Sequence, residues 1–190
     1  MINLQKTINP IYLPLLQNKD KILLFQGGSG TGKSFFCAQK IILRVLSEKP
    51  PFNYYVFRKW KIQIKNSVYS EIKNVIDYWN LHEYFQINKS THSFECINGN
   101  KIISLGLDDS EKIKSLSNVG SIFVEEITEL NNEELDQLIL RMRGNGSYLQ
   151  LMAAFNPISK RNFIFERFFN KETAEPLNLP DTTIIQTTYK

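Results

Sequence analysis

Short apolar runs alternate along this chain with longer segments whose apolar residues recur every three or four positions. Runs of the first kind predict strands, and the second pattern predicts helices with one buried face. We expect strands at about 21–26, 54–57, 121–124, 148–155 and 183–188. We expect helices at about 33–46, 60–80, 131–144 and 159–170. Such alternation is typical of an α/β fold with a mainly parallel sheet, and 190 residues suffice for a single domain.

Two local signals refine this pattern. The segment 93–107 interrupts the alternation and contains Asn98-Gly99, a favoured two-residue hairpin turn. We therefore expect a β-hairpin inserted at the edge of the main sheet. Asn131 followed by Glu134 matches a capping box, in which each side chain bonds the other residue's backbone N–H, so a helix should begin there.

Residues 27–34 read Gly-Gly-Ser-Gly-Thr-Gly-Lys-Ser and follow the first predicted strand directly. A strand, this glycine-rich turn and a helix together form the P-loop (Walker A), which binds the phosphates of a nucleoside triphosphate and does not by itself distinguish a kinase, a switch or a motor. Lys33 would reach the β- and γ-phosphates, and the Ser34 hydroxyl would ligate Mg²⁺. The alternative is a turn that only links strand to helix. The residues expected to contact ATP are Gly27, Gly28, Ser29, Gly30, Thr31, Gly32, Lys33 and Ser34.

Two adjacent carboxylates, Glu125 and Glu126, follow the predicted strand at 121–124. In P-loop ATPases, an acid in the first position holds Mg²⁺ through water, and an acid in the second orients and deprotonates the attacking water. Two acids capping a strand at the surface are the alternative. The strand at 148–155 ends at Asn156, which would lie beside the γ-phosphate if this strand inserts next to the P-loop strand. Asn156 is then a candidate sensor, or it only begins an Asn-Pro turn.

Several cations could stabilise charge on the transferring phosphoryl group as an arginine finger. Arg58 and Arg143 lead, and for each a solvated surface charge is the alternative. The further candidates are Lys112, Lys114 and Arg141. A finger supplied by a neighbouring subunit would require an oligomer. Tyr12 precedes the P-loop strand at a distance suited to stacking on adenine, and it could equally pack in the core.

The bulk composition is that of an ordinary globular protein, with 42% hydrophobic and 22% charged residues. The net charge of +4 fits a polyanionic partner but does not require one. Cys37 and Cys96 lie far apart in the sequence and indicate neither a disulfide framework nor a zinc site. No apolar run approaches a membrane span, and the first residues lack a signal-peptide core, so we expect a cytoplasmic protein without membrane contact.

Taken in order, these motifs resemble the large terminase subunit of tailed bacteriophages, the motor that packages DNA into the capsid. The segments that carry the resemblance, besides the P-loop, are 56–59 with 67–69, 106–115, 120–130, 140–144, 155–157 and 187–190. The resemblance implies a three-layer, RecA-like P-loop fold of the catalytic-glutamate (ASCE) class with the hairpin as an insertion. It also implies Mg²⁺-dependent ATP hydrolysis that moves double-stranded viral DNA into the procapsid. The partners it implies are the portal, the small terminase subunit and further copies in a ring, in the host cytoplasm.

The resemblance covers nearly all of the 190 residues, but only the ATPase half of the family's chain. We therefore expect one ATPase domain at 1–190 and no nuclease activity, because the family's nuclease domain is absent. Ser29 departs from the basic residue that members often carry at this P-loop position, so another cation would have to supply that charge. A helicase-like DNA-dependent ATPase, a nucleotide-dependent assembly switch and a small-molecule or nucleotide kinase are the alternatives, and a kinase would not need Glu126.

Overall fold

The backbone is organised around one eight-stranded sheet with the order β3-β4-β5-β2-β6-β7-β1-β8. The computed structural model describes residues 3–108, 113, 116–157 and 159–187. Its strands are β1 (Ile22–Gly27), β2 (Asn53–Arg58), β3 (Phe85–Asn88), β4 (Ser93–Cys96), β5 (Lys101–Gly106), β6 (Val119–Glu125), β7 (Gln150–Phe155) and β8 (Thr182–Thr187). Its helices are α1 (Leu4–Thr7), α2 (Lys33–Ser47), α3 (Val68–Tyr78), α5 (Asn132–Arg141) and α6 (Phe163–Phe168). Short 3₁₀ helices are η1 (Pro10–Leu16), η2 (Lys61–Asn66), η3 (His82–Tyr84) and η4 (Ile127–Glu129).

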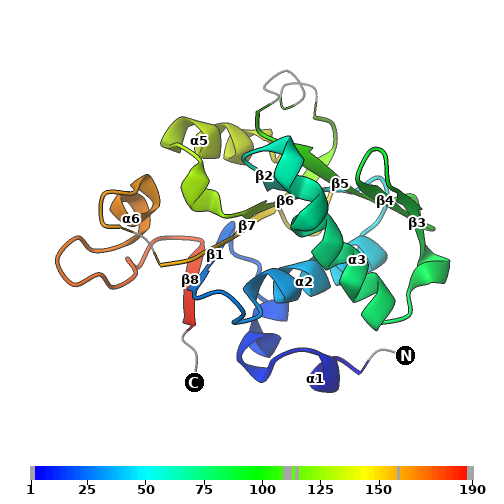
Figure 1. Ribbon diagram of the computed structural model, residues 1–190, viewed down its shortest axis with the longest axis horizontal. Coiled ribbons are helices and arrows are strands. Elements are labelled where there is room, and N and C mark those ends of the chain that lie inside the picture. The colour runs from blue at the N-terminus through cyan, green and yellow to red at the C-terminus, as the bar shows by residue number, and fades with distance from the viewer. Residues whose placement is uncertain (1–2, 109–112, 114–115, 158, 188–190) are drawn as a thin grey trace.

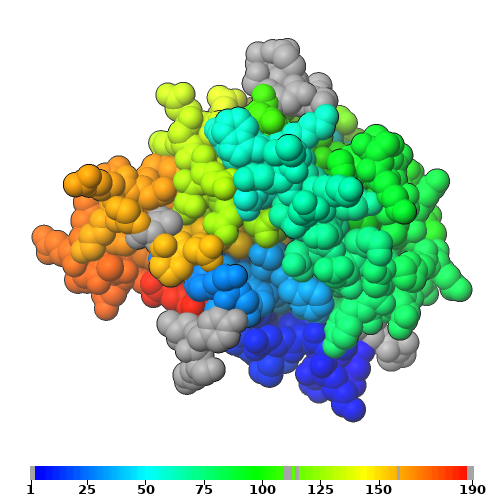
Figure 2. Space-filling view, viewed as in Figure 1, coloured from blue at the N-terminus to red at the C-terminus, as the bar shows by residue number. Residues whose placement is uncertain are grey.

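Six neighbouring strands of this sheet, from β5 to β8, are parallel, whereas β4 pairs in antiparallel fashion with both β5 and β3. The pair β4–β5 is the expected hairpin, and β5 also pairs in parallel with β2, so the hairpin is joined to the main sheet. Figure 1 places β3 and β4 at one end of the molecule and α6 at the other, and the space-filling view in Figure 2 shows the same separation. The expected mainly parallel α/β fold with an edge hairpin is confirmed.

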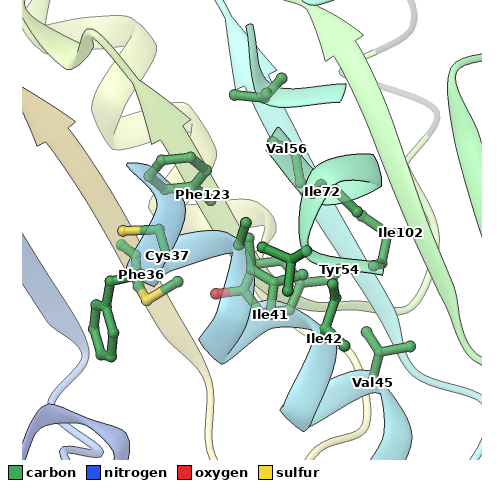
Figure 3. Close-up of a cluster of buried hydrophobic side chains, with 14 of the residues drawn as sticks. Phe36, Cys37, Ile41, Ile42, Val45, Tyr54, Val56, Ile72, Ile102 and Phe123 are labelled. Atoms are coloured by element: carbon green, nitrogen blue, oxygen red, sulfur yellow. The ribbon is translucent and has the colours of Figure 1, made fainter. Parts of the chain in front are cut away.

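Helices cover both faces of the sheet and make three layers. One apolar cluster joins α2, α3 and η1 to side chains such as Leu23 and Phe25, while the other joins α5 and α6 to side chains such as Leu24. Successive residues of β1 thus point to opposite faces, as the pleat of a strand requires. Figure 3 shows the first cluster, where side chains of α2 such as Ile41 pack against Tyr54 and Val56 of β2 and Ile72 of α3.

Most predicted boundaries agree with the structure to within about two residues, as for α2 and β7. The capping box at Asn131 is confirmed. The Asn131 side chain accepts a hydrogen bond from the Glu134 backbone N–H, and the Glu134 side chain accepts one from the Asn131 backbone N–H. The helix predicted at 60–80 is wrong in its first part. Ser67 has non-helical backbone angles (φ −125°, ψ −108°), and these separate η2 from α3. The last predicted helix is also shorter, because the Asn162 side chain caps α6 by accepting from the Ile164 N–H.

Candidate functional site

A cleft of about 450 Å³ opens where the carboxyl ends of β6 and β7 meet the loop after β1. Its lining includes the P-loop residues Ser29, Gly30, Gly32, Lys33 and Ser34, together with Glu125, Glu126 and Asn156. The sheet order explains this convergence, because β7 lies between β6 and β1 and all three run in parallel. The expected insertion of the 148–155 strand beside the P-loop strand is therefore confirmed. Parallel strands end at one edge of a sheet, where α/β proteins usually bind ligands.

The P-loop wraps around its own lysine. Gly30 and Gly32 adopt the left-handed region (φ 79° and φ 82°), which a side chain would disfavour, and Gly32 is the N-cap of α2. The Thr31 hydroxyl donates to the Gly28 carbonyl at 3.0 Å. The Lys33 ammonium donates to the carbonyls of Gly27 (2.6 Å) and Gly28 (2.7 Å). The turn thus has the compact form of a phosphate-binding loop, with the lysine held against it.

Burial determines the proton affinity of this lysine. Lys33 is only 7% exposed. Desolvation lowers its pKa, and the nearby carboxylates of Glu126 and Glu125 oppose that shift. The Lys33 ammonium lies near two carboxylates and is bonded to backbone carbonyls. It can exchange those carbonyls for phosphate oxygens, which are stronger acceptors.

The acidic pair divides between two backbone conformations. Glu125 is the last residue of β6, whereas Glu126 adopts the left-handed region (φ 53°, ψ 54°) as the chain leaves the strand for η4. The Oε2 atom of Glu125 is buried without a hydrogen-bond partner in the described structure, and the Arg58 guanidinium lies 3.8 Å from it. Burial raises the pKa of Glu126, the Arg58 charge lowers it, and the Glu125 charge raises it further.

These oxygens suit a magnesium ion. Mg²⁺ prefers oxygen ligands and keeps several waters, with few protein groups. The Ser34 hydroxyl can supply such a ligand, and the unpartnered, buried oxygen of Glu125 in the same cleft can accept a hydrogen bond from a metal-bound water. Over the described ranges, no three His, Cys, Asp or Glu side chains form a metal-binding group by themselves. The residues therefore fit a cation whose other ligands come from phosphate and water.

The side chain of Asn156 is hydrogen-bonded to Glu126. Its Nδ2 donates to Oε1 of Glu126 at 3.1 Å, across the boundary between β7 and β6. The sensor role assigned to Asn156 stays a prediction, and its side chain lies in the cleft beside Glu126.

The two leading finger candidates lie in very different places. The Arg58 guanidinium is engaged by three side chains, Glu125 (3.8 Å), Glu129 (3.2 Å) and Gln63 (3.3 Å), and it does not line the cleft. Its geometry indicates that it orients Glu125 rather than pointing at a phosphate. A finger role for Arg58 would require it to leave these partners.

Arg143 cannot reach the cleft of its own chain. Its neighbour Gly144 donates to the carbonyl of Val119, the first residue of β6, whereas Glu125 is the last. Six residue-to-residue steps along the strand separate these ends by ~20 Å. The prediction that Arg143 acts as a finger is therefore wrong within one chain, and only a role toward a neighbouring subunit stays open. Lys112 and Lys114, the two lysine candidates, lie outside the described residues.

Tyr12 belongs to the core. Its side chain is 0% exposed, its ring stacks on Phe36 at 4.9 Å between centroids, and its edge meets Phe25. The hydroxyl donates to the carbonyl of Thr31 at 3.0 Å. The adenine-stacking alternative is wrong for this conformation because no face of the ring is open. Tyr12 instead packs in the core and contacts the P-loop through its hydrogen bond to Thr31.

One residue of the cleft escaped sequence analysis. Glu71, in the first turn of α3, lines the cleft with Ser34 and the acidic pair. Nothing in its local pattern distinguishes it from the polar face of an amphipathic helix.

Two further findings concern the described chain as a whole. Both cysteines are free and buried, and no helix in it has the length and apolar character that crossing a membrane would take.

Comparison with known proteins gives one consistent family. Residues 19–190 match the family model described as phage terminase large subunit. The PBSX phage terminase large subunit of Bacillus subtilis (strain 168) is 29% identical over 182 residues, which are 95% of this chain and 42% of that protein. The chain thus spans less than half the length of the curated relatives that it matches.

Solved structures share the fold at low sequence identity. A large terminase from a thermophilic bacteriophage, in complex with ADP, superposes with a TM-score of 0.65 at 11% identity, over 97% of this chain and 42% of that one. The N-terminal domain of the DNA packaging ATPase from bacteriophage phi29 gives a TM-score of 0.65 at 19% identity, over 98% of this chain and 95% of that one. These likenesses support the RecA-like P-loop fold.

Proposed function

Because this chain belongs to the family of phage terminase large subunits, we propose that it hydrolyses ATP, with Mg²⁺ bound, to drive double-stranded DNA into the viral procapsid. The observation that carries the proposal is that Lys33, Ser34, Glu125 and Glu126 line a single cleft. Phosphate-binding, metal-binding and base groups then lie within reach of one nucleotide.

The P-loop would bind the triphosphate through its backbone and its lysine. The N-terminus of α2 begins at Lys33 and directs unpaired N–H groups and a positive dipole end into the cleft. When the phosphates arrive, the Lys33 ammonium would leave the carbonyls of Gly27 and Gly28 for phosphate oxygens. The P-loop therefore holds the Lys33 ammonium next to the position where it would contact the phosphates.

Ser34 and Glu125 would hold the metal. Bound Mg²⁺ neutralises charge on the β- and γ-phosphates and so assists phosphoryl transfer. Arg58 contributes by fixing the Glu125 carboxylate, to which it lies at 3.8 Å.

Glu126 would act as the base that orients and deprotonates the attacking water. Burial raises its pKa, which strengthens it as a proton acceptor, while Arg58 keeps it from rising further. The hydrogen bond from Asn156 holds one carboxylate oxygen, so Asn156 can release or retain the base according to the state of the nucleotide.

The names of the relatives support the macromolecular partners that we propose. The phi29 protein is named a DNA packaging ATPase, and this chain has a net charge of +4, which favours contact with a phosphate backbone. We propose double-stranded DNA as the polymer moved, with a ring of copies on the portal, the small terminase subunit as a partner, and the host cytoplasm as the location.

The test compares ATP hydrolysis with and without double-stranded DNA in wild type, Glu126→Gln and Glu83→Gln. Glu83 is exposed in η3 and does not line the cleft, so it controls for the lost charge. We expect Glu126→Gln to lose about a hundredfold or more in hydrolysis while retaining Mg-ATP binding, and Glu83→Gln to behave as wild type. Wild-type turnover in Glu126→Gln would overturn the assignment of the base. Hydrolysis that DNA does not change would favour the assembly-switch alternative.

A further inference from the structure

A third carboxylate reaches the cleft from an element that carries none of the sequence motifs. Glu71 is in the first turn of α3, and it lines the cleft with Ser34, Glu125 and Glu126. Its side chain is half-buried. The cleft therefore receives acids from two directions: from the end of β6 and from α3 on the P-loop side of the sheet.

Packing does not explain this carboxylate. The buried face of α3 consists of apolar and aromatic residues such as Val68, Ile72 and Val75, to which Glu71 does not belong. Within the described ranges, no hydrogen bond or ion pair involves its carboxylate. Burial raises the pKa of Glu71, and the like charge of Glu125 raises it further. The surroundings of Glu71 thus disfavour the ionised form of its carboxylate.

The nearby cations are committed elsewhere. The Lys33 ammonium is bonded to the carbonyls of Gly27 and Gly28, and the Arg58 guanidinium is engaged by Glu125 and Glu129. A cation bound in the cleft would give the Glu71 carboxylate a partner that these two side chains do not supply. A magnesium ion that keeps several waters offers donors to a carboxylate that does not touch the metal itself.

We propose that Glu71 is a positioning residue that accepts hydrogen bonds from the water ligands of the magnesium ion held by Ser34 and Glu125. This inference rests on the proposed function and names a third acid for the same site. Groups that orient metal ligands in this way typically change metal affinity by about 10- to 100-fold when they are removed.

A residue that positions metal-bound water affects Mg²⁺ and nucleotide binding differently from a residue that only stabilises the fold. Without metal, the Glu71 carboxylate repels the triphosphate, and with Mg²⁺ present it stabilises the hydrated cation. Glu71 should therefore increase the thermodynamic coupling between Mg²⁺ and nucleotide, in either order of binding. Replacing it with the neutral isostere should weaken Mg²⁺-nucleotide binding while leaving metal-free nucleotide binding unchanged or tighter.

Calorimetric titration of a non-hydrolysable ATP analogue, in excess EDTA and over a range of Mg²⁺ concentrations, tests this. The proteins are wild type, Glu71→Gln, Glu71→Asp and, as a surface charge control, Glu83→Gln. We expect the Mg²⁺-to-analogue coupling to fall about tenfold in Glu71→Gln, to be retained largely in Glu71→Asp, and to be unchanged in Glu83→Gln. Thermal unfolding of each variant checks the fold.

The outcomes separate the two proposals. Equal coupling in wild type and Glu71→Gln overturns the role of Glu71 and leaves the proposed function standing. Equal weakening with and without Mg²⁺, or the same loss in Glu71→Asp as in Glu71→Gln, also overturns it, since packing rather than charge would then matter. If wild type binds the analogue neither with nor without Mg²⁺, the proposed function fails and the inference fails with it.

Discussion

Helix α2 carries a buried cation at each end, and the two are held by different kinds of partner. Lys33 begins the helix, is 7% exposed, and donates to two carbonyls of the P-loop. Arg44, in the last turn, is 5% exposed. Its guanidinium donates to the Glu48 carboxylate at 2.7 Å and to the Tyr148 carbonyl at 2.8 Å, and it lies 3.7 Å from the Tyr148 ring centroid.

The difference is whether the partners can be replaced. Lys33 lines the open cleft, so its ammonium can exchange the carbonyls of Gly27 and Gly28 for a phosphate bound there. The partners of Arg44 include Ser121 and Tyr148, which lie near the starts of β6 and β7 at the opposite edge of the sheet. One helix thus supplies a cation for ligand binding at one edge and a cation for stability at the other.

Lys33→Ala should lower ATP hydrolysis by about a thousandfold, because it removes the cation proposed to bind the β- and γ-phosphates. The free energy of unfolding should change by less than ~1 kcal/mol, since the hydrogen bonds lost to the Gly27 and Gly28 carbonyls are offset by removing a lysine whose charge is disfavoured by burial. Steady-state hydrolysis and urea unfolding measure the two effects. A loss of stability as large as that of an Arg44 variant would break the comparison.

Arg44→Met should destabilise the protein by about 3 kcal/mol, because it leaves the largely buried Glu48 carboxylate without its cation. Urea unfolding measures the change. The folded fraction should still bind nucleotide with wild-type affinity, since Arg44 is remote from the cleft. Adding Glu48→Gln should recover part of the loss, and a double variant no more stable than Arg44→Met alone would contradict the ion-pair explanation.

Lys40, between these two, should make stability depend on pH. It is 1% exposed, donates to the carbonyls of Leu15 and Asn18, and burial lowers its pKa from 10.5 to about 8. Between these values the unfolded chain binds more protons than the folded one, so stability rises with pH. Relative to Lys40→Met, wild type should gain about 2 kcal/mol between pH 8 and pH 10.

Unfolding curves of both proteins at the two pH values measure this difference, and other titrating groups cancel between them. A wild-type protein that gains no stability relative to Lys40→Met in that window would show that the fold does not lower the pKa of Lys40.

Asn156→Ala should reduce hydrolysis about tenfold, because Glu126 loses the hydrogen bond that holds its Oε1 atom. Binding of Mg-ATP and the unfolding free energy should change little, as Asn156 is exposed. Asn156→Asp serves as a matched comparison, because it keeps the size of the side chain but places a like charge beside Glu126. Unchanged hydrolysis in both variants would remove Asn156 from the site.

Much of the site could be predicted because its signals are local. The P-loop spacing ties the lysine and the serine to a strand and a helix, and each acid of Glu125-Glu126 inherits its place from the strand that ends there. Parallel strands then bring Asn156 to the same edge without further information. The hairpin at Asn98-Gly99 and the capping box at Asn131 were readable for the same reason, since each depends on a few neighbouring residues.

The misplaced residues all depend on contacts between distant segments. Arg143 follows α5 to the far edge of the sheet, and Tyr12 turns into the core against Phe36. Arg58 is held by carboxylates from the end of β6 and from η4. Periodicity says that such side chains lie on a helix or strand end, but it does not say which partner faces them.

The P-loop, the acidic strand and the α/β class can be read from the sequence, because strand and helix periods and motif spacing are properties of neighbouring residues. Only the fold shows that Lys33 lies at the cleft while Arg44 lies in the interior at the other edge of the sheet, and that Glu71 shares the cleft with the acidic pair. Charge interactions and burial depend on distance in space, and 54 positions of sequence separate Glu71 from Glu125 while both line one cleft.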